Sequence, residues 1–296
     1  MPSPFDPDDL SRFSRFSIHT TPYKTVGGSH AITTDVLIPR SLLTSPSPSP
    51  PRPLLLRFHG GAPASSRPSS RRGWLLQLAG RARGRRHRSS RPATGCCPKR
   101  ASADVEDVWR WVKGEDADEE AGGGGLKRSA TAAYPMLDMR SAHFSTSYAK
   151  PMFGLPMQPR SLYDAHVAAV RSGDRPGVIS ADPRCERFEL MFCVPQNGIC
   201  SELFPADERA WVPFEVVEDG ARLPRGGLFV AHGAGDDVVP IEGSTAFERL
   251  VRERDGEVRF VLAVREGGHG FDAAASVDDE WMREGLRGVV QAWLEE

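Results

Sequence analysis

Apolar and polar residues follow the periodicity of regular structure at both ends of the chain. Two N-terminal segments, residues 16–26 and 31–39, are rich in Thr, Val and Ile and are separated by Gly27 and Gly28, which predicts a β-hairpin. A short apolar run at 54–61 ends in glycines, as expected for a buried strand that leads into a loop. The pattern therefore predicts that the chain opens with β-structure.

The C-terminal part alternates apolar strands with amphipathic helices. Residues 226–233 and 257–264 are apolar runs of strand length, and residues 244–255 between them have helical periodicity. An amphipathic helix is predicted at 276–296, with Ser276 as its N-cap. This alternation of strands and helices predicts an α/β fold, in which a parallel sheet is covered by helices.

The periodicity is lost between residues 62 and 102. This segment holds one apolar cluster, at 74–79, and otherwise consists largely of Arg, Ser, Pro and Gly. From His59 to Ala103 there are 11 Lys and Arg residues and no Asp or Glu. Such a composition buries too little apolar surface to offset chain entropy. We therefore predict an irregular or disordered segment apart from a short helix at 74–79.

The middle of the chain returns to regular patterns in stages. Residues 103–112 have helical periodicity, and residues 113–128 form an acidic, glycine-rich linker by composition. A strand is predicted at 129–139. Residues 140–225 combine helical character with many Pro and aromatic residues. A long insertion of this kind inside a domain is typical of a lid or binding segment.

Length and composition indicate which classes of protein the chain does not resemble. The chain of 296 residues can form one large domain, and its formal net charge of −1 gives no overall signature of nucleic-acid binding. The N-terminus has no apolar signal region, and no run approaches the roughly 18 apolar residues of a membrane span. Five cysteines show no metal-ligand spacing and indicate reduced thiols: Cys96, Cys97, Cys185, Cys193 and Cys200. We expect a cytoplasmic protein without a metal site.

Three glycine-containing motifs at predicted strand ends could carry chemistry. The His-Gly-Gly of residues 59–61 would leave backbone N–H groups free to bind an oxyanion. Asp236 follows a predicted strand and could orient a histidine through its Nδ1–H. His269 lies among glycines directly after the next strand. Each motif alone is more often an ordinary turn, a loop carboxylate or a surface histidine.

In this order, the three motifs resemble the α/β-hydrolase fold. They are closest to the esterase and lipase branch with a His-Gly-Gly oxyanion loop, which includes hormone-sensitive lipases and arylacetamide deacetylases. The resemblance covers three parts of the chain, roughly 16–61, 103–112 and 129–296. It implies a mostly parallel sheet flanked by helices in one domain, with residues 140–225 as a lid. It also implies a carboxylic ester hydrolase that acts on acyl or aryl esters and needs no cofactor.

The resemblance also assigns roles to individual residues. The oxyanion loop would comprise Gly60, Gly61 and Ala62, with Ala62 where the family usually has a third glycine. Asp236 would be the acid, because it lies four residues before Pro240 as in the family's D-x-x-V-P, and Asp237 is the second candidate. His269 would be the general base.

The family's nucleophile has no counterpart in the chain. In the family, a serine lies on a Gly-x-Ser-x-Gly turn between the segments that resemble residues 105–112 and 134–139, where a strand and a helix must also fit. The linker at 113–128 replaces that turn, so we expect a core that lacks one or two strands. Ser129 is too close to the following segment for an intervening helix, although it stays a candidate. Ser29, in Gly27-x-Ser29-x-Ala31, resembles the nucleophile motif on paper, but it lies in the N-terminal hairpin and precedes the oxyanion loop.

The Arg-rich segment also departs from the family, which has an apolar strand and a motif like Tyr-Arg-Leu-x-Pro-Glu there. The codons for residues 94–100, read one base earlier, permit Tyr-Arg-Leu-Leu-Pro-Glu-Ala. We hypothesise that residues from about 62 to 101 are translated out of frame and that the serine segment was lost by splicing or deletion. An uninterrupted cDNA would exclude this. The alternative is a genuine basic loop, but with one aromatic residue and no recognised motif it indicates no nucleic-acid partner.

Three functions remain open from the sequence. The chain is a hydrolase by descent that is inactive as written, a pseudoenzyme that binds small acyl compounds, or an active esterase that uses an unconventional serine. All three have a small-molecule ester or acyl compound as the partner.

Overall fold

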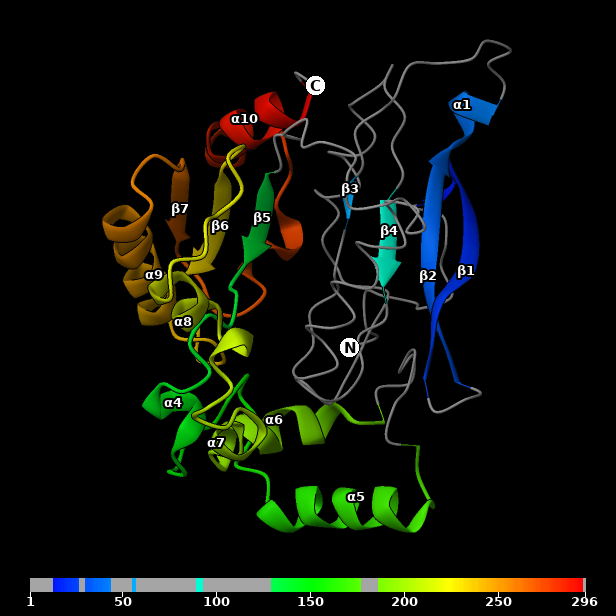
Figure 1. The fold of residues 1–296 in the computed structure, drawn as a ribbon, viewed down its shortest axis with the longest axis vertical. Coiled ribbons are helices and arrows are strands. Elements are labelled where there is room, and N and C mark those ends of the chain that lie inside the picture. Colours follow the sequence, from blue (N-terminus) through cyan, green and yellow to red (C-terminus); the bar gives the residue numbers. More distant parts are fainter. Residues whose placement is uncertain are drawn as a thin grey trace. The chain divides into compact units, whose positions relative to one another are not determined.

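The computed structural model describes residues 13–26, 30–43, 55–56, 89–92, 129–176 and 186–294. The chain divides into two compact units. The first comprises residues 1–122 and 176–188, and the second comprises residues 123–175 and 189–296. Figure 1 labels the helices and strands of both units. The arrangement of the whole chain as one domain stays a prediction.

The first unit contains a four-stranded sheet in the order β1-β2-β4-β3. Strands β1 (Phe16–Val26) and β2 (His30–Pro39) are antiparallel along their length, so the predicted hairpin pairing is confirmed. Strand β4 (Ser89–Pro92) pairs antiparallel with β2 and parallel with β3 (Leu55–Leu56). A short helix, α1 (Arg40–Leu43), follows β2.

Strand β4 lies inside the segment for which the sequence predicts irregular structure. Its sequence, Ser-Ser-Arg-Pro, has no apolar alternation, and a ladder of backbone hydrogen bonds needs none. The rest of residues 62–102, the predicted helix at 103–112 and the linker at 113–128 lie outside the described residues. The predicted loss of core strands therefore stays a prediction.

The second unit is built on a parallel sheet in the order β5-β6-β7, which confirms the predicted parallel arrangement. The strands are β5 (Ala130–Ala133), β6 (Leu228–Gly233) and β7 (Phe260–Arg265). Every residue of β6 is buried, which explains its continuous apolar run. Strand β5 ends at Ala133, earlier than the predicted strand at 129–139, because Tyr134 takes a positive φ of 39° and leaves the extended conformation.

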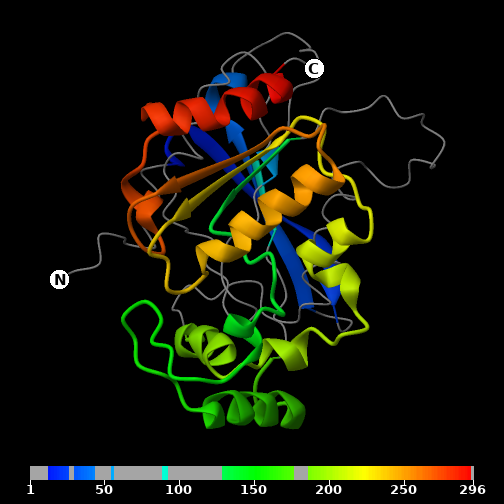
Figure 2. The same cartoon turned by 90° about the vertical axis from the view of Figure 1, so that its left-hand side faces the viewer.

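Two helices cover opposite faces of this sheet. Helix α9 (Ile241–Arg254) packs on the face that carries Leu228 and Val230, and Figure 2 shows it lying across the strands. Helix α10 (Glu280–Leu294) packs on the other face, where its Gly285 meets the ring of Phe229. Alternate residues of one strand thus contact different helices.

Helix α10 begins later than the sequence predicts. Its first residue is Glu280, so the assignment of Ser276 as the N-cap is wrong. The Ser276 Oγ accepts the N–H of Asp278, and the Ser276 N–H donates to the Asp279 carboxylate, so Ser276 closes the turn that precedes the helix. The Asp279 carbonyl accepts the N–H of Arg283. Asp279 therefore occupies the start of the helix, because its carbonyl already accepts a helical hydrogen bond.

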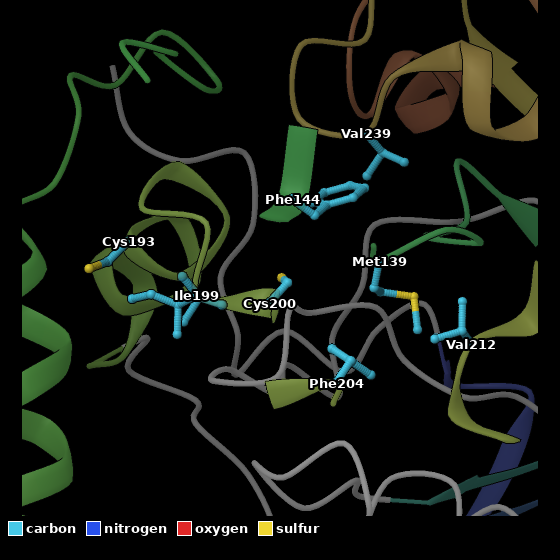
Figure 3. Packing of buried hydrophobic residues seen from close by; sticks show 9 residues of the cluster. Met139, Phe144, Cys193, Ile199, Cys200, Phe204, Val212 and Val239 are labelled. Atoms are coloured by element: carbon cyan, nitrogen blue, oxygen red, sulfur yellow. The ribbon is translucent and has the colours of Figure 1, made fainter. Parts of the chain in front are cut away.

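Within residues 140–225, the described parts 140–176 and 186–225 form a set of helices, as their composition indicates. These are α4 (Ala142–Ser145), α5 (Arg160–Ser172), α6 (Phe188–Gln196), α7 (Cys200–Leu203), the 3-10 helix η2 (Arg209–Trp211) and α8 (Pro213–Glu218). They share a buried apolar cluster that includes Phe144 and Ile199 and reaches Val239, in the loop after β6 (Figure 3). The cluster connects these helices to the loop that carries Asp236. The role of residues 140–225 as a lid stays a prediction.

Two cysteines belong to this cluster, and Cys96, Cys97 and Cys185 lie outside the described residues. Cys193 and Cys200 are both buried and free. Burial raises the pKa of the Cys200 thiol to about 12, with a smaller opposing effect from the Lys150 charge. The thiol is therefore protonated at neutral pH. Among the helices that the structure describes, none is long and apolar enough to cross a membrane.

Candidate functional site

Asp236 and His269 meet at the carboxyl ends of the adjacent strands β6 and β7. The Nδ1–H of His269 donates to Oδ2 of Asp236 at 2.9 Å and lies 3.1 Å from Oδ1. The Asp236 side chain is fully buried, whereas the imidazole is 24% exposed. The structure thus brings together the two residues that the sequence predicts as acid and base. Because Nδ1 faces a carboxylate, the neutral form of the ring has its proton on Nδ1 and has Nε2 as the acceptor.

Backbone amides hold the carboxylate in place. Oδ1 of Asp236 accepts the N–H of Val238 at 2.9 Å and the N–H of Val239 at 2.8 Å. Burial acts to raise the pKa of Asp236, but the hydrogen bonds from His269, Val239 and Val238 outweigh it and lower the pKa below its ordinary value. The acid is therefore ionised at neutral pH and can stabilise a positively charged imidazole.

Glycines let the loops after β6 and β7 pack backbone against backbone. A Cβ atom on Gly233 would lie 2.6 Å from the carbonyl oxygen of Gly267 and 2.8 Å from that of Gly268. The N–H of Gly235 donates to the carbonyl of Gly267 at 2.9 Å. A side chain at position 233 would separate the two loops. Gly233 is thus explained by the close approach that brings the acid to the histidine.

The second acid candidate, Asp237, lies elsewhere. Its side chain is exposed, and its Oδ2 accepts the N–H of Phe153 at 3.0 Å. The structure therefore places Asp236, and not Asp237, against His269.

Aromatic side chains that sequence reasoning did not identify surround the histidine. The rings of Tyr134 and His269 are 4.1 Å apart between centroids, and the Tyr134 hydroxyl donates to the buried Asp272 at 3.1 Å. The Phe153 ring is 6.1 Å from the imidazole and 49% exposed. Tyr134 and Phe153 both have positive φ, of 39° and 56°, which is strained for residues other than glycine. Strain of this kind is concentrated at functional sites.

Amide side chains at the end of α6 fix the segment that carries Phe153. Gln196 is fully buried, donates from Nε2 to the carbonyls of Lys150 at 3.1 Å and Pro156 at 3.3 Å, and accepts the N–H of Gln158 at 2.8 Å. These three bonds hold residues 150–158 on both sides of Phe153. The exposed ring beside His269 therefore belongs to an ordered segment.

The remaining predicted residues do not join this site in the described part of the chain. Ser129 precedes β5, and its Oγ donates to the carbonyl of Val289 on α10 at 3.0 Å. It thus lies at the amino end of β5, whereas His269 follows the carboxyl end of the parallel sheet. The three oxyanion-loop residues and Ser29 lie outside the described residues: Gly60, Gly61, Ala62 and Ser29.

Beyond the acid–histidine pair, the described residues offer few groups that could bind a ligand or a metal ion. Within them, no side chain forms a hydrogen bond with Nε2 of His269, and no group of three or more His, Cys, Asp or Glu residues could hold a metal ion. An open cavity of about 500 Å³ lies beside β7 and is lined in part by Arg265, Phe271 and Trp281. Neither Asp236 nor His269 lines it, so this cavity is separate from the acid–histidine pair.

A second histidine, His232, lies beneath the loop of the acid. It is fully buried in β6, with Nδ1 2.8 Å from Oγ of Ser244 on α9 and Nε2 2.7 Å from the carbonyl oxygen of Val239. Burial lowers the pKa of His232, against a smaller opposing effect of its bond to Val239. The ring is therefore neutral at neutral pH.

We expect the free energy of unfolding to fall as the pH drops below about 6.5, the ordinary histidine value. The folded pKa of His232 lies below that value, so the unfolded chain takes up a proton that the folded chain resists. Such a histidine contributes a slope of at most about 1.4 kcal/mol per pH unit. Burial lowers the pKa of His143 too. Urea unfolding between pH 7.5 and 5 measures the slope. In His232→Gln the slope of the free energy of unfolding against pH should decrease, and an unchanged slope would contradict the prediction.

Comparison with solved structures identifies the class of fold. A thermophilic esterase of Thermogutta terrifontis aligns with a TM-score of 0.54 and 15% identity over 96% of this chain and 93% of the esterase. Its butyrate-bound form gives a TM-score of 0.55 and 16% identity over 96% and 95%. The acylaminoacyl peptidase of Pyrococcus horikoshii gives 0.50 and 10% identity, over 94% of this chain and 41% of the peptidase. The protein therefore shares the α/β-hydrolase fold of these solved structures.

Sequence comparison gives a weaker likeness. A curated protein of a Phoma species, named "Probable carboxylesterase M8", is 25% identical over 140 residues. The match covers 47% of this chain and 42% of that relative, so the chain matches less than half of the relative's length. No family model matches the chain. The likeness is thus to esterases, in fold over nearly the whole chain and in sequence over about half of it.

Proposed function

We propose that this protein is an α/β-hydrolase of the carboxylic ester hydrolase type that binds small ester or acyl compounds without forming an acyl-enzyme. The observation that carries the proposal is the contact between His269 and Asp236. The carboxylate holds Nδ1–H, and Nε2 is left as an acceptor for a hydroxyl group or a water molecule. This arrangement supports a site at which a proton can be taken up beside a bound carbonyl compound.

The surroundings of the histidine support an acyl or aryl ligand. The rings of Tyr134 and Phe153 flank the imidazole and offer apolar surface to a hydrocarbon group. The similar esterase of Thermogutta terrifontis has been solved with butyrate bound. Short acyl groups of this size are therefore the first ligands to test. The fit of a ligand to residues 140–225 as a lid is part of the same proposal.

The absence of an acyl-enzyme is proposed from the sequence and from the position of Ser129. Esterases of this fold use a serine that attacks the ester carbonyl while the histidine takes its proton. The sequence holds no Gly-x-Ser-x-Gly. Ser129 precedes β5 and donates to the carbonyl of Val289, at the other end of the strand from His269. Binding without acyl transfer is the function that fits both observations.

Two measurements on the full chain test this proposal. A fluorophosphonate probe should leave its intact mass unchanged while it labels an active serine esterase in a parallel reaction. Butyrate or methyl butyrate should shift the ring resonances of Tyr134 and Phe153, with affinity of about millimolar for so small a ligand, and His269→Ala should reduce these shifts. Stoichiometric labelling of a serine, at Ser129 or elsewhere, would instead identify an active esterase. No shift with either compound would exclude this ligand class.

A further inference from the structure

The loop that carries Asp236 rests on a buried polar pair that takes no part in the proposed chemistry. His232 on β6 and Ser244 on α9 are both fully buried, and their side chains are 2.8 Å apart. We infer that His232 is a positioning residue for Asp236, which it holds in place through the peptide groups of Val239. This inference rests on the proposed role of Asp236 and His269 as the functional pair.

The hydrogen bonds define the state of the His232 ring. The carbonyl oxygen of Val239 can only accept, so Nε2 of His232 carries a proton and donates to it at 2.7 Å. In the neutral ring, Nδ1 then accepts the hydroxyl proton of Ser244. Both ring nitrogens are satisfied within the core. Turning the ring over would break both bonds, so its orientation is fixed.

Val239 transmits this fixed position to the acid. Its N–H donates to Oδ1 of Asp236 at 2.8 Å, while its carbonyl accepts from His232 at 2.7 Å. Both peptide groups that flank the Val239 side chain are therefore held. The side chain itself is 5% exposed and packs with Phe144 in the apolar cluster of Figure 3. The turn at 236–239 is thus fixed from the side of the core.

The histidine does not act on the carboxylate by direct contact. Nε2 of His232 lies 3.6 Å from Oδ2 of Asp236, which is too long for a hydrogen bond. Its proton is already directed to Val239. The effect on Asp236 must therefore pass through the turn, which gives the inference a specific signature in the amides of Val238 and Val239.

Leucine at position 232 removes both ring bonds and tests this directly. In His232→Leu we expect the pKa of Asp236 to rise toward the ordinary aspartate value of about 3.9. Hydrogen exchange at the amides of Val238 and Val239 should become about tenfold faster, as expected when bonds to a charged group weaken. Carboxyl ¹³C NMR of the full chain measures the pKa, and amide NMR measures the exchange. In His232→Gln, whose side-chain amide can donate to Val239, both values should return toward those of the original protein.

A matched variant separates positioning from general loss of stability. Val230→Ala removes buried apolar volume from the same strand without touching the turn, and it should lower stability but leave the pKa of Asp236 unchanged. If His232→Leu resembles Val230→Ala in both readouts, the inference is wrong. If His232→Leu does not fold, Ser244→Ala decides. In Ser244→Ala we expect the pKa of Asp236 and the amide exchange to change in the same direction but by less. If neither quantity changed, the inference would be overturned.

The same readouts are independent of the proposed function. They follow Asp236 and its amides in the unliganded chain, so they require neither hydrolysis nor a bound acyl compound. A chain that binds no ester or acyl compound would overturn the proposed function and leave the positioning result standing. If the substitutions at His232 left the pKa of Asp236 and its amides unchanged, the positioning inference would be overturned and the proposed function would stand.

Discussion

Replacing Asp236 with alanine is expected to lower the free energy of unfolding by about 3 kcal/mol, because it leaves buried donors that were bonded to a charged group without an acceptor. The variant leaves three donors without their acceptor, the amides of Val238 and Val239 and the Nδ1–H of His269. The first two lie in a turn that is held by the core and cannot easily rotate toward water. A buried donor without a partner has lost its hydrogen bonds to water and gained none in the protein, which lowers stability.

The neighbouring acid provides a matched control. Asp237 is exposed and accepts one hydrogen bond, from the N–H of Phe153. Water can replace that bond, so Asp237→Ala should cost less than about 1 kcal/mol. Urea unfolding of both variants at pH 7 gives the comparison. Equal costs would mean that the acid of the site is wrongly assigned.

Asp236→Asn separates the two halves of the contact. The asparagine oxygen can still accept the amides of Val238 and Val239, but its NH₂ group cannot accept the Nδ1–H of His269. We therefore expect an intermediate loss of stability, with the turn retained and the imidazole held only by its longer 3.1 Å contact with that oxygen. In the same variant, the response of Tyr134 and Phe153 to butyrate should weaken if the orientation of His269 matters for binding.

Much of the second unit could be predicted from the sequence because its elements bury one continuous surface. The apolar runs of β6 and β7 and the periodicity of α9 and α10 depend on local spacing, which the sequence displays directly. Helix boundaries were less predictable, because they depend on which backbone groups find partners. Ser276 has the right chemistry for an N-cap, but Asp279 starts the helix.

The acid and the histidine were predictable for a topological reason. Parallel neighbouring strands end at the same edge of a sheet, so residues that follow β6 and β7 must come close. The contact of Tyr134 with His269 spans 135 positions and depends on a backbone conformation that no local pattern indicates. His232 did carry a signal, since a polar side chain within a fully buried strand needs a buried partner. The identity of that partner, Ser244, required the fold.

The largest effect on stability is expected at Phe229, in the centre of β6. Its ring is fully buried and faces Gly285 of α10, where an added Cβ would lie 2.1 Å from Cε2 of the ring. Phe229→Ala should lower the free energy of unfolding by about 4 kcal/mol, the usual cost of removing a buried aromatic ring. Thermal or urea unfolding measures the loss. A cost below about 1 kcal/mol would mean that the ring is not part of a packed core.

Gly285, which faces the Phe229 ring, provides a test of whether β6 packs against α10. Gly285→Ala should cost about 1–3 kcal/mol in the original protein because the methyl group overlaps the ring. In the Phe229→Ala background the space is open, and the same change should stabilise α10 by up to about 1 kcal/mol through helix propensity. Gly243→Ala in α9, where an added Cβ meets nothing within 4 Å, should have the same sign in both backgrounds. If Gly285→Ala destabilised the protein in both backgrounds, the added methyl group would not be clashing with the Phe229 ring. The packing of β6, which leads to Asp236, against α10 would then be wrong.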